Sequence, residues 1–169
     1  MMENTLRLFG IVEESVVDGP GFRYTIFVQG CPHGCPGCHN PGSHPFTGGT
    51  LRDIDSLFQE IRTNPLLKGV TFSGGEPFCQ PRPLAELAKK VHAIGMDVMI
   101  YSGWTLEQLQ AMDNPDIHAL LSEADFLVDG PFVLEKRDLE LNFRGSSNQR
   151  VLDMKKTRQA GSPVWADFA

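Results

Sequence analysis

The sequence predicts an α/β fold whose parallel strands are joined by helices. Short apolar runs alternate along the chain with amphipathic helical patterns, and this alternation is typical of parallel strands connected by right-handed crossovers. The chain has 169 residues, of which 41% are hydrophobic and 21% are charged. This length and composition fit one globular domain with its own core, so we expect a single domain over residues 1–169.

The first half of the chain is expected to contain two strands, a long loop and a helix. The strands are Leu8–Val12 and Tyr24–Val28, the second being rich in β-branched and aromatic residues. The segment Gly30–Gly49 is rich in glycine and proline, which excludes regular structure there. A helix should follow, because Thr50 and Asp53 have the spacing of a capping pair. Its apolar face would consist of Leu51, Ile54, Leu57, Phe58 and Ile61.

The second half of the chain alternates more regularly between strands and helices. The expected strands are Val70–Phe72, Asp97–Tyr101, Phe126–Asp129 and a last one at Gln149–Asp153. The expected helices are Pro83–Ile94, which Gly95 would end, Thr105–Met112 and Ile117–Ala124. In folds of this kind, ligands bind at the carboxyl ends of the strands.

Four loop segments follow predicted strands and should therefore meet at one edge of the sheet. They are the cysteine-containing loop, Gly74-Gly75, Ser102-Gly103 and Asp129-Gly130. This convergence predicts a site at the carboxyl edge that is built from all four segments.

Three cysteines in the loop have metal-ligand spacing. Cys31, Cys35 and Cys38 form a C-x3-C-x2-C pattern, and thiolates this close need a soft metal centre to neutralise their charge. Zinc would require a fourth ligand, which His33, His39 or Cys79 would supply. A [4Fe–4S] cluster normally takes four cysteines, so three would leave one iron open. The spacing leaves both interpretations open.

Charge and hydropathy exclude some classes of partner. The formal net charge of −6 disfavours a broad surface for nucleic acid or an anionic membrane. No apolar stretch is long enough to span a bilayer, and Met1–Arg7 lacks the features of a secretory signal. We therefore expect a cytoplasmic protein with reduced thiols, in which Cys79 is a free buried thiol.

The combination of segments resembles the radical S-adenosylmethionine enzymes, whose hallmark is this C-x3-C-x2-C loop. Asp18–Arg23 (DGPGFR) and Phe27–Cys31 (FVQGC) look like the entry to the glycyl-radical activating enzymes, and Ser73–Pro77 (SGGEP) resembles their second motif. The stretch Asp129–Arg150, ending in NFRGSSNQR, is similar to one branch, the activating proteins of anaerobic ribonucleoside-triphosphate reductase. Two departures are visible: Gly37 and His39 stand where many radical enzymes place an aromatic residue nearby, and the cysteine-rich insert of larger activases is missing.

The resemblance implies the fold, the cofactor and the residues of the site. The fold would be an incomplete, TIM-like β/α barrel, since 169 residues fall well short of the roughly 250 of an eight-fold barrel. The three cysteines would hold one [4Fe–4S] cluster at the carboxyl edge of the strands, with one iron free to bind S-adenosylmethionine. Residues expected to contact the cosubstrate are Gly37, Cys38, His39, Gly74, Gly75, Glu76, Ser102, Asp129 and Asn148.

The implied activity is reductive cleavage of S-adenosylmethionine to a 5′-deoxyadenosyl radical, which abstracts a hydrogen atom from a glycine of the reductase. The chain needs no catalytic base or nucleophile, because the cofactor supplies the chemistry. Arg144 and Arg150 are candidates for holding a carboxylate or meeting the partner, as Phe132, Val133 and Trp165 are for docking. The electron donor would be a flavodoxin or a ferredoxin. Two alternatives stay open: an activase of another glycyl-radical enzyme, such as pyruvate formate-lyase, and a zinc- or cluster-binding module.

Overall fold

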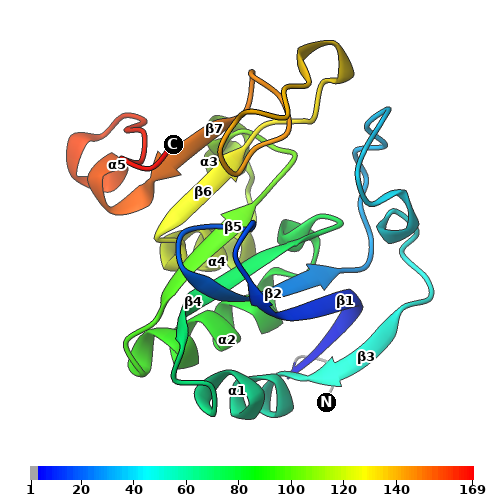
Figure 1. Ribbon diagram of the computed structural model, residues 1–169, viewed down its shortest axis with the longest axis vertical. Coiled ribbons are helices and arrows are strands. Elements are labelled where there is room, and N and C mark those ends of the chain that lie inside the picture. Colours follow the sequence, from blue (N-terminus) through cyan, green and yellow to red (C-terminus); the bar gives the residue numbers. More distant parts are fainter. Residues whose placement is uncertain (1–3) are drawn as a thin grey trace.

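A computed structural model describes residues 4–169 and contains, over this range, one seven-stranded sheet with the order β3-β1-β2-β4-β5-β6-β7. The strands are β1 (Thr5–Ser15), β2 (Phe22–Val28), β3 (Thr50–Asp53), β4 (Leu67–Gly74), β5 (Asp97–Tyr101), β6 (Phe126–Asp129) and β7 (Arg150–Asp153). The fold is therefore a mixed α/β fold around a sheet that contains parallel strands, as the sequence predicted (Figure 1).

Only the centre of the sheet is parallel. Strand β2 pairs in parallel with β4, β4 with β5, and β5 with β6. The pairs at the two sides, β1 with β2, β1 with β3 and β6 with β7, are antiparallel. The expectation of parallel strands was thus wrong for β1 and β7, and β3 was not expected as a strand. Strand β1 is followed directly by β2, with no helix to carry the chain back, so the two can pair only as antiparallel neighbours.

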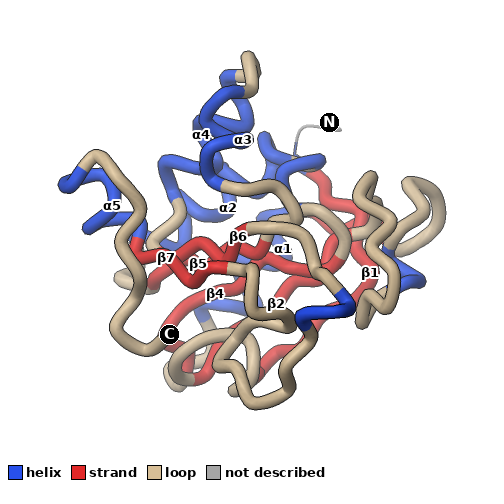
Figure 2. Tube along the Cα trace, turned by 90° about the horizontal axis from the view of Figure 1, so that it is seen from above, coloured by secondary structure: helices blue, strands red, loops and turns tan. Residues whose placement is uncertain are grey.

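The helices are α1 (Ile54–Arg62), α2 (Pro81–Ala93), α3 (Leu106–Ala111), α4 (Pro115–Glu123) and α5 (Met154–Ala160). Figure 2 shows α2, α3 and α4 gathered on one side of the sheet. Side chains cap the N-termini of most of these helices. Thr105 and Gln108 form a capping box on α3, and Asn114 caps α4. Asp153 begins α5, and Gly161, with a φ of 72°, ends it.

The start of α1 differs from the expectation. Thr50 does not cap the helix but begins β3, which pairs with β1 at the sheet edge. The cap is Asp53, whose carboxylate accepts a hydrogen bond from the backbone N–H of Asp55. Leu51 is consequently half exposed on the strand instead of lying on the buried helix face. Pairing with β1 satisfies the backbone of this segment, and this long-range contact outweighs the local helical pattern.

The two faces of the sheet differ in character. Alternate residues of the central strands, such as Ile26, Phe72 and Ile100, are fully buried in the main core beneath the helices. The residues between them face the other way and are often polar, as Thr25, Thr71 and Ser73 are. A small second cluster on that face consists of Met99, Val128, Val151 and Ala166. None of the helices in residues 4–169 has the length and apolar character that crossing a bilayer would require.

Candidate functional site

A cleft of about 590 Å³ lies on the face away from the helices, at the carboxyl ends of the parallel strands. Phe27, Ser73 and Tyr101 line it from β2, β4 and β5. The cysteine loop (Gly30–Gly49) and the segment that follows β6 contribute the rest of the wall, and Figure 1 shows both extending from this end of the sheet. The predicted meeting of loops at the carboxyl edge is present in the structure.

The three cysteines of the loop all line this cleft, and each is partly buried. Backbone hydrogen bonds fix the two ends of their segment: Cys31 N–H donates to His44 O (2.9 Å), and Cys38 N–H donates to Cys35 O (3.2 Å). The backbone N–H of Asn40 points at the Cys38 sulfur at 3.5 Å. Hydrogen bonds to sulfur are one means by which proteins tune iron–sulfur centres.

The electrostatics of the loop fit a cationic centre. Burial raises the pKa of the Cys31 thiol, and the nearby Glu76 carboxylate and the other two cysteines raise it further, against a hydrogen bond from the His33 backbone that lowers it. Three adjacent thiolates therefore repel one another unless a metal neutralises them. The donor set, three thiols at one open cleft, fits a [4Fe–4S] cluster. Within residues 4–169 no three His, Cys, Asp or Glu side chains are grouped around the position of a single ion.

The glycine pair after β4 packs against the strand that leads into the cysteine loop. A Cβ on Gly74 would overlap the backbone of Val28, and one on Gly75 would overlap the carbonyl of Gly30. Gly75 N–H donates to Val28 O (3.0 Å) and Glu76 N–H donates to Gly30 O (2.8 Å). Both glycines line the cleft. The close approach that requires glycine here is therefore an approach between two backbone segments of the protein.

Glu76 lies beneath the cleft and is fully buried. Its carboxylate accepts hydrogen bonds from the backbone of Phe78 (3.0 Å) and Gly103 (2.8 Å) and from the hydroxyl of Ser102 (3.0 Å). The ring Nε2 of His33 lies 2.6 Å from the same carboxylate. The group therefore joins the loops after β4 and β5 to the cysteine loop, and of the two predicted contact residues Glu76 and Ser102, only Ser102 lines the cleft.

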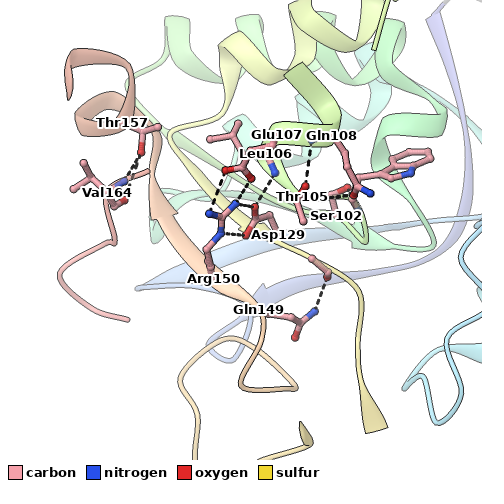
Figure 3. Close-up of polar contacts among 12 residues, drawn as sticks. Ser102, Thr105, Leu106, Glu107, Gln108, Asp129, Gln149, Arg150, Thr157 and Val164 are labelled. Atoms are coloured by element: carbon pink, nitrogen blue, oxygen red, sulfur yellow. Dashed lines mark hydrogen bonds and ion pairs between the residues drawn. The ribbon is translucent and has the colours of Figure 1, made fainter. Parts of the chain in front are cut away.

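Asp129 is committed to a network at the other side of the site. It is almost fully buried, accepts from the backbone of Leu106 (2.7 Å) and pairs through both oxygens with Arg150, which also contacts Glu107 at 2.6 Å (Figure 3). The hydrogen bonds to Asp129 and, to a smaller extent, to Glu107 raise the pKa of Arg150. Asn148 donates to Pro131 O (2.8 Å), while its buried Oδ1 has no partner among the described residues. Neither Asp129 nor Asn148 lines the cleft.

An aromatic residue reaches the cysteine loop from a distant segment. The ring of Phe132 lies 5.5 Å from that of His39, and both line the cleft. Gly37, in the left-handed conformation (φ 74°), does not line the cleft but packs against Leu134 and Phe132. The sequence offered Phe132 only as a docking residue, and His33 only as an alternative zinc ligand. Phe132 contacts His39 across 93 residues of the sequence, and His33 contacts Glu76 across 43, and no local pattern reveals such contacts.

Arg144 and Arg150 have different roles in the structure. Arg144 lines the cleft, donates to the carbonyl groups of Ser147 and Gln149, and places its guanidinium 4.9 Å from the ring of Trp165. Arg150 is engaged with Asp129 and Glu107. Of the two arginines that the sequence singled out, Arg144 is the one that faces the cleft.

Comparison with known proteins gives consistent matches over most of the chain. The family model described as a 4Fe-4S single cluster domain matches residues 17–152. The anaerobic ribonucleoside-triphosphate reductase-activating proteins of Escherichia coli and Haemophilus influenzae are 34% and 35% identical; each match covers 80% of this chain and 91% or 90% of the relative. The pyruvate formate-lyase-activating enzyme of Clostridium pasteurianum is 36% identical over 56% of this chain and 42% of its own. Among solved structures, QueE of Escherichia coli matches with a TM-score of 0.48 at 19% identity, over 60% and 54% of the two chains.

Proposed function

The chain belongs to the family of anaerobic ribonucleoside-triphosphate reductase-activating proteins, and on this premise we propose that it is the enzyme that activates such a reductase. The observation that carries the proposal is the placement of Cys31, Cys35 and Cys38 along one open cleft at the carboxyl ends of the parallel strands. When bound, the cluster would supply one electron that cleaves a sulfur–carbon bond of S-adenosylmethionine, giving methionine and a 5′-deoxyadenosyl radical that takes a hydrogen atom from a glycine of the reductase.

The three cysteines are the proposed cluster ligands, one for each of three irons. The fourth cysteine, Cys79, does not line the cleft, and burial, with help from Glu76 and Cys31, raises its pKa to about 12. A thiol that resists ionisation is a poor metal ligand. This supports a site with one iron left for the cosubstrate.

The cosubstrate would bind between the cysteine loop and the strand ends. Gly74, Gly75 and Ser102 line the cleft on the strand side, where backbone groups and a hydroxyl can orient its polar end. His39 and Phe132 line the loop side and offer ring surfaces to its adenine. Glu76, Asp129 and Asn148 lie behind this surface, so we assign them to holding the wall in place, together with the turn at Gly37.

We further propose that the sheet forms part of a β/α barrel whose inner face is the cleft, and that residues 1–169 form one radical S-adenosylmethionine domain. Figure 2 shows α2, α3 and α4 on one side of the sheet, as helices surround the strands of a barrel. The residues of the main core beneath the helices are different from those that line the cleft. The open side would admit the glycine-bearing loop of the reductase. A flavodoxin or ferredoxin would donate the electron, in the cytoplasm, where cysteines stay reduced; none of the four cysteines forms a disulfide.

The experiment is anaerobic reconstitution with iron and sulfide, followed by electron paramagnetic resonance of the reduced protein with and without S-adenosylmethionine. We expect a [4Fe–4S]⁺ signal that changes on adding the cosubstrate, and a glycyl radical on the reductase when both proteins are mixed. Pyruvate formate-lyase serves as the exchange partner, because the relative from Clostridium pasteurianum matches about half of this chain. A signal that ignores the cosubstrate would contradict the proposal, and a radical formed only on pyruvate formate-lyase would reassign the partner.

A further inference from the structure

The carboxylate of Glu76 is a junction between three loops of the site. It lies in the turn after β4, is 0% exposed, and accepts hydrogen bonds from its own turn at Phe78 and from the loop after β5 at Ser102 and Gly103. The fourth contact comes from the ring Nε2 of His33, which lies 2.6 Å from the same carboxylate. The cysteine loop is thereby attached to both neighbouring strand ends.

The ring of His33 occupies a fitted position. Only 14% of its side chain is exposed, and the edge of Trp104 packs against it with ring centres 4.7 Å apart. On another side, a Cβ on Gly103 would overlap the imidazole ring, so the absence of a side chain at Gly103 makes room for it. A carboxylate, an aromatic ring and a glycine together fix the position of this one side chain.

No comparable contact holds the rest of the loop between the cysteines. Backbone hydrogen bonds fasten its ends, from Gly30 to Ser43 and from Cys31 to His44. Between Pro32 and Gly37, within the part of the chain that the structure describes, His33 is the residue whose side chain makes a hydrogen bond to the body of the protein. Four of the six residues from Pro32 to Gly37 are glycine or proline, which have no polar side chain with which to anchor the turn.

We propose that His33 is a positioning residue: its contact with Glu76 fixes the cysteine loop on the glycine-rich turn after β4, and so sets the distance between the cluster and the cosubstrate. This inference rests on the proposed function. Cys31, Cys35 and Cys38 line the cleft together with Gly74 and Gly75, so a cosubstrate that contacts both the cysteine loop and the glycine turn requires a constant spacing between them. A shift of about 1 Å in such a site can reduce the rate by two orders of magnitude.

The first test uses the protein without cluster. In His33→Ala the loop loses its side-chain anchor, and we expect iodoacetamide to alkylate Cys35 at least about tenfold faster, the factor that corresponds to one hydrogen bond to a charged group. His33→Gln keeps an N–H donor of similar reach and should restore most of the protection. His44→Gln, a histidine change in the same loop, is the matched control and should alkylate like the wild type. Mass spectrometry of the alkylated peptides gives the rate for each cysteine.

The second test uses the reconstituted protein. We expect His33→Ala to assemble a cluster whose paramagnetic resonance signal needs at least about tenfold more S-adenosylmethionine to change, and His33→Gln to respond more like the wild type. Equal alkylation rates in His33→Ala and the wild type would overturn the anchor. Faster alkylation with an unchanged response to the cosubstrate would overturn the positioning role. A wild-type signal that ignores S-adenosylmethionine would instead overturn the proposed function, and the alkylation rates would still decide whether the anchor exists.

Discussion

The centre of the sheet and the cysteine loop are held together in opposite ways. Arg23 on β2 is fully buried and makes hydrogen bonds to the Thr71 hydroxyl, to the carbonyl groups of Val70 and Pro20, and to Asp97 at 2.6 Å. The cysteine loop, in contrast, contains no Lys, Arg, Asp or Glu at all; none occurs between Arg23 and Arg52. Within residues 4–169, the hydrogen bond that joins the loop to a buried acidic side chain is the one between His33 and Glu76.

This difference indicates a division between stability and chemistry. Buried, interlinked contacts in the sheet keep the strand ends in place, so that removing one weakens the whole fold. The loop has few contacts to lose, and its thiolates repel one another without a metal. Substitutions in the loop should therefore remove the cofactor and leave the fold, whereas substitutions in the sheet should weaken the fold first.

The largest effect is expected from Cys35→Ala, which tests the chemical side of this division. Cys35 is partly buried and lines the cleft, and no strand or helix depends on its side chain. We expect loss of bound iron, of the visible absorbance of the cluster and of all cosubstrate cleavage, while the free energy of unfolding of the cluster-free protein changes by less than about 1 kcal/mol. Cys79→Ala is the control and should still bind iron. A variant that unfolds would show that the loop also stabilises the fold.

Arg23→Met tests the stability side and has the next largest effect. Removing one partner of a buried ion pair costs about 3–5 kcal/mol, and we expect the lower end, because the Asp97 side chain is 22% exposed and can be partly hydrated. Urea denaturation of the cluster-free protein measures the loss. Arg82→Met removes a surface arginine that pairs with Asp116 at 3.4 Å and should cost about 0.2–1 kcal/mol. Equal losses of unfolding free energy in Arg23→Met and Arg82→Met would contradict the view that buried contacts in the sheet carry the stability of the fold.

Arg150→Met sharpens the comparison at the far side of the sheet, with a smaller effect of about 1–3 kcal/mol. Asp129, only 1% exposed, keeps its hydrogen bond from Leu106 in this variant. Arg150 lowers the pKa of Glu107 below its usual 4.5. A lowered pKa in the folded state adds stability above pH 4.5 that is lost as the pH falls below it. The difference in unfolding free energy between wild type and variant should therefore narrow in acid, and a constant difference would contradict this pairing.

The sequence predicted the strands and helices best where their signals are local. Strands β5 and β6 match their expected bounds, and three cysteines with metal-ligand spacing do line one cleft. The start of α1 was wrong, because pairing between Thr50–Asp53 and β1 outweighs a helical pattern. The contacts of Glu76 with His33 and of Phe132 with His39 join segments far apart in the sequence. Such contacts follow from the folded chain and have no periodic signal of their own.

Cys79 lies at the border of the two regions, and its substitution should disturb the fold and the cofactor least. Burial, followed by Glu76 and Cys31, raises its pKa from 9 to about 12. At pH 8 it should then react with iodoacetamide about a thousandfold more slowly than an ordinary thiol, because only the thiolate reacts. Alkylation of the cluster-free protein, followed by mass spectrometry, measures this rate, with Cys79 in urea as the unfolded control.

The same shift predicts how stability depends on alkaline pH. A thiol with a raised pKa in the folded state contributes stability below pH 9, the usual value, and loses it as the pH rises towards 12. Cys79→Ala should therefore show a weaker decline of unfolding free energy above pH 9 than the wild type. If Cys79 instead reacts as fast as Cys35 at pH 8, the turn after β4 opens as readily as the cysteine loop. The turn that contains Glu76 and Cys79 would then belong to the mobile part of the site and not to the stable sheet.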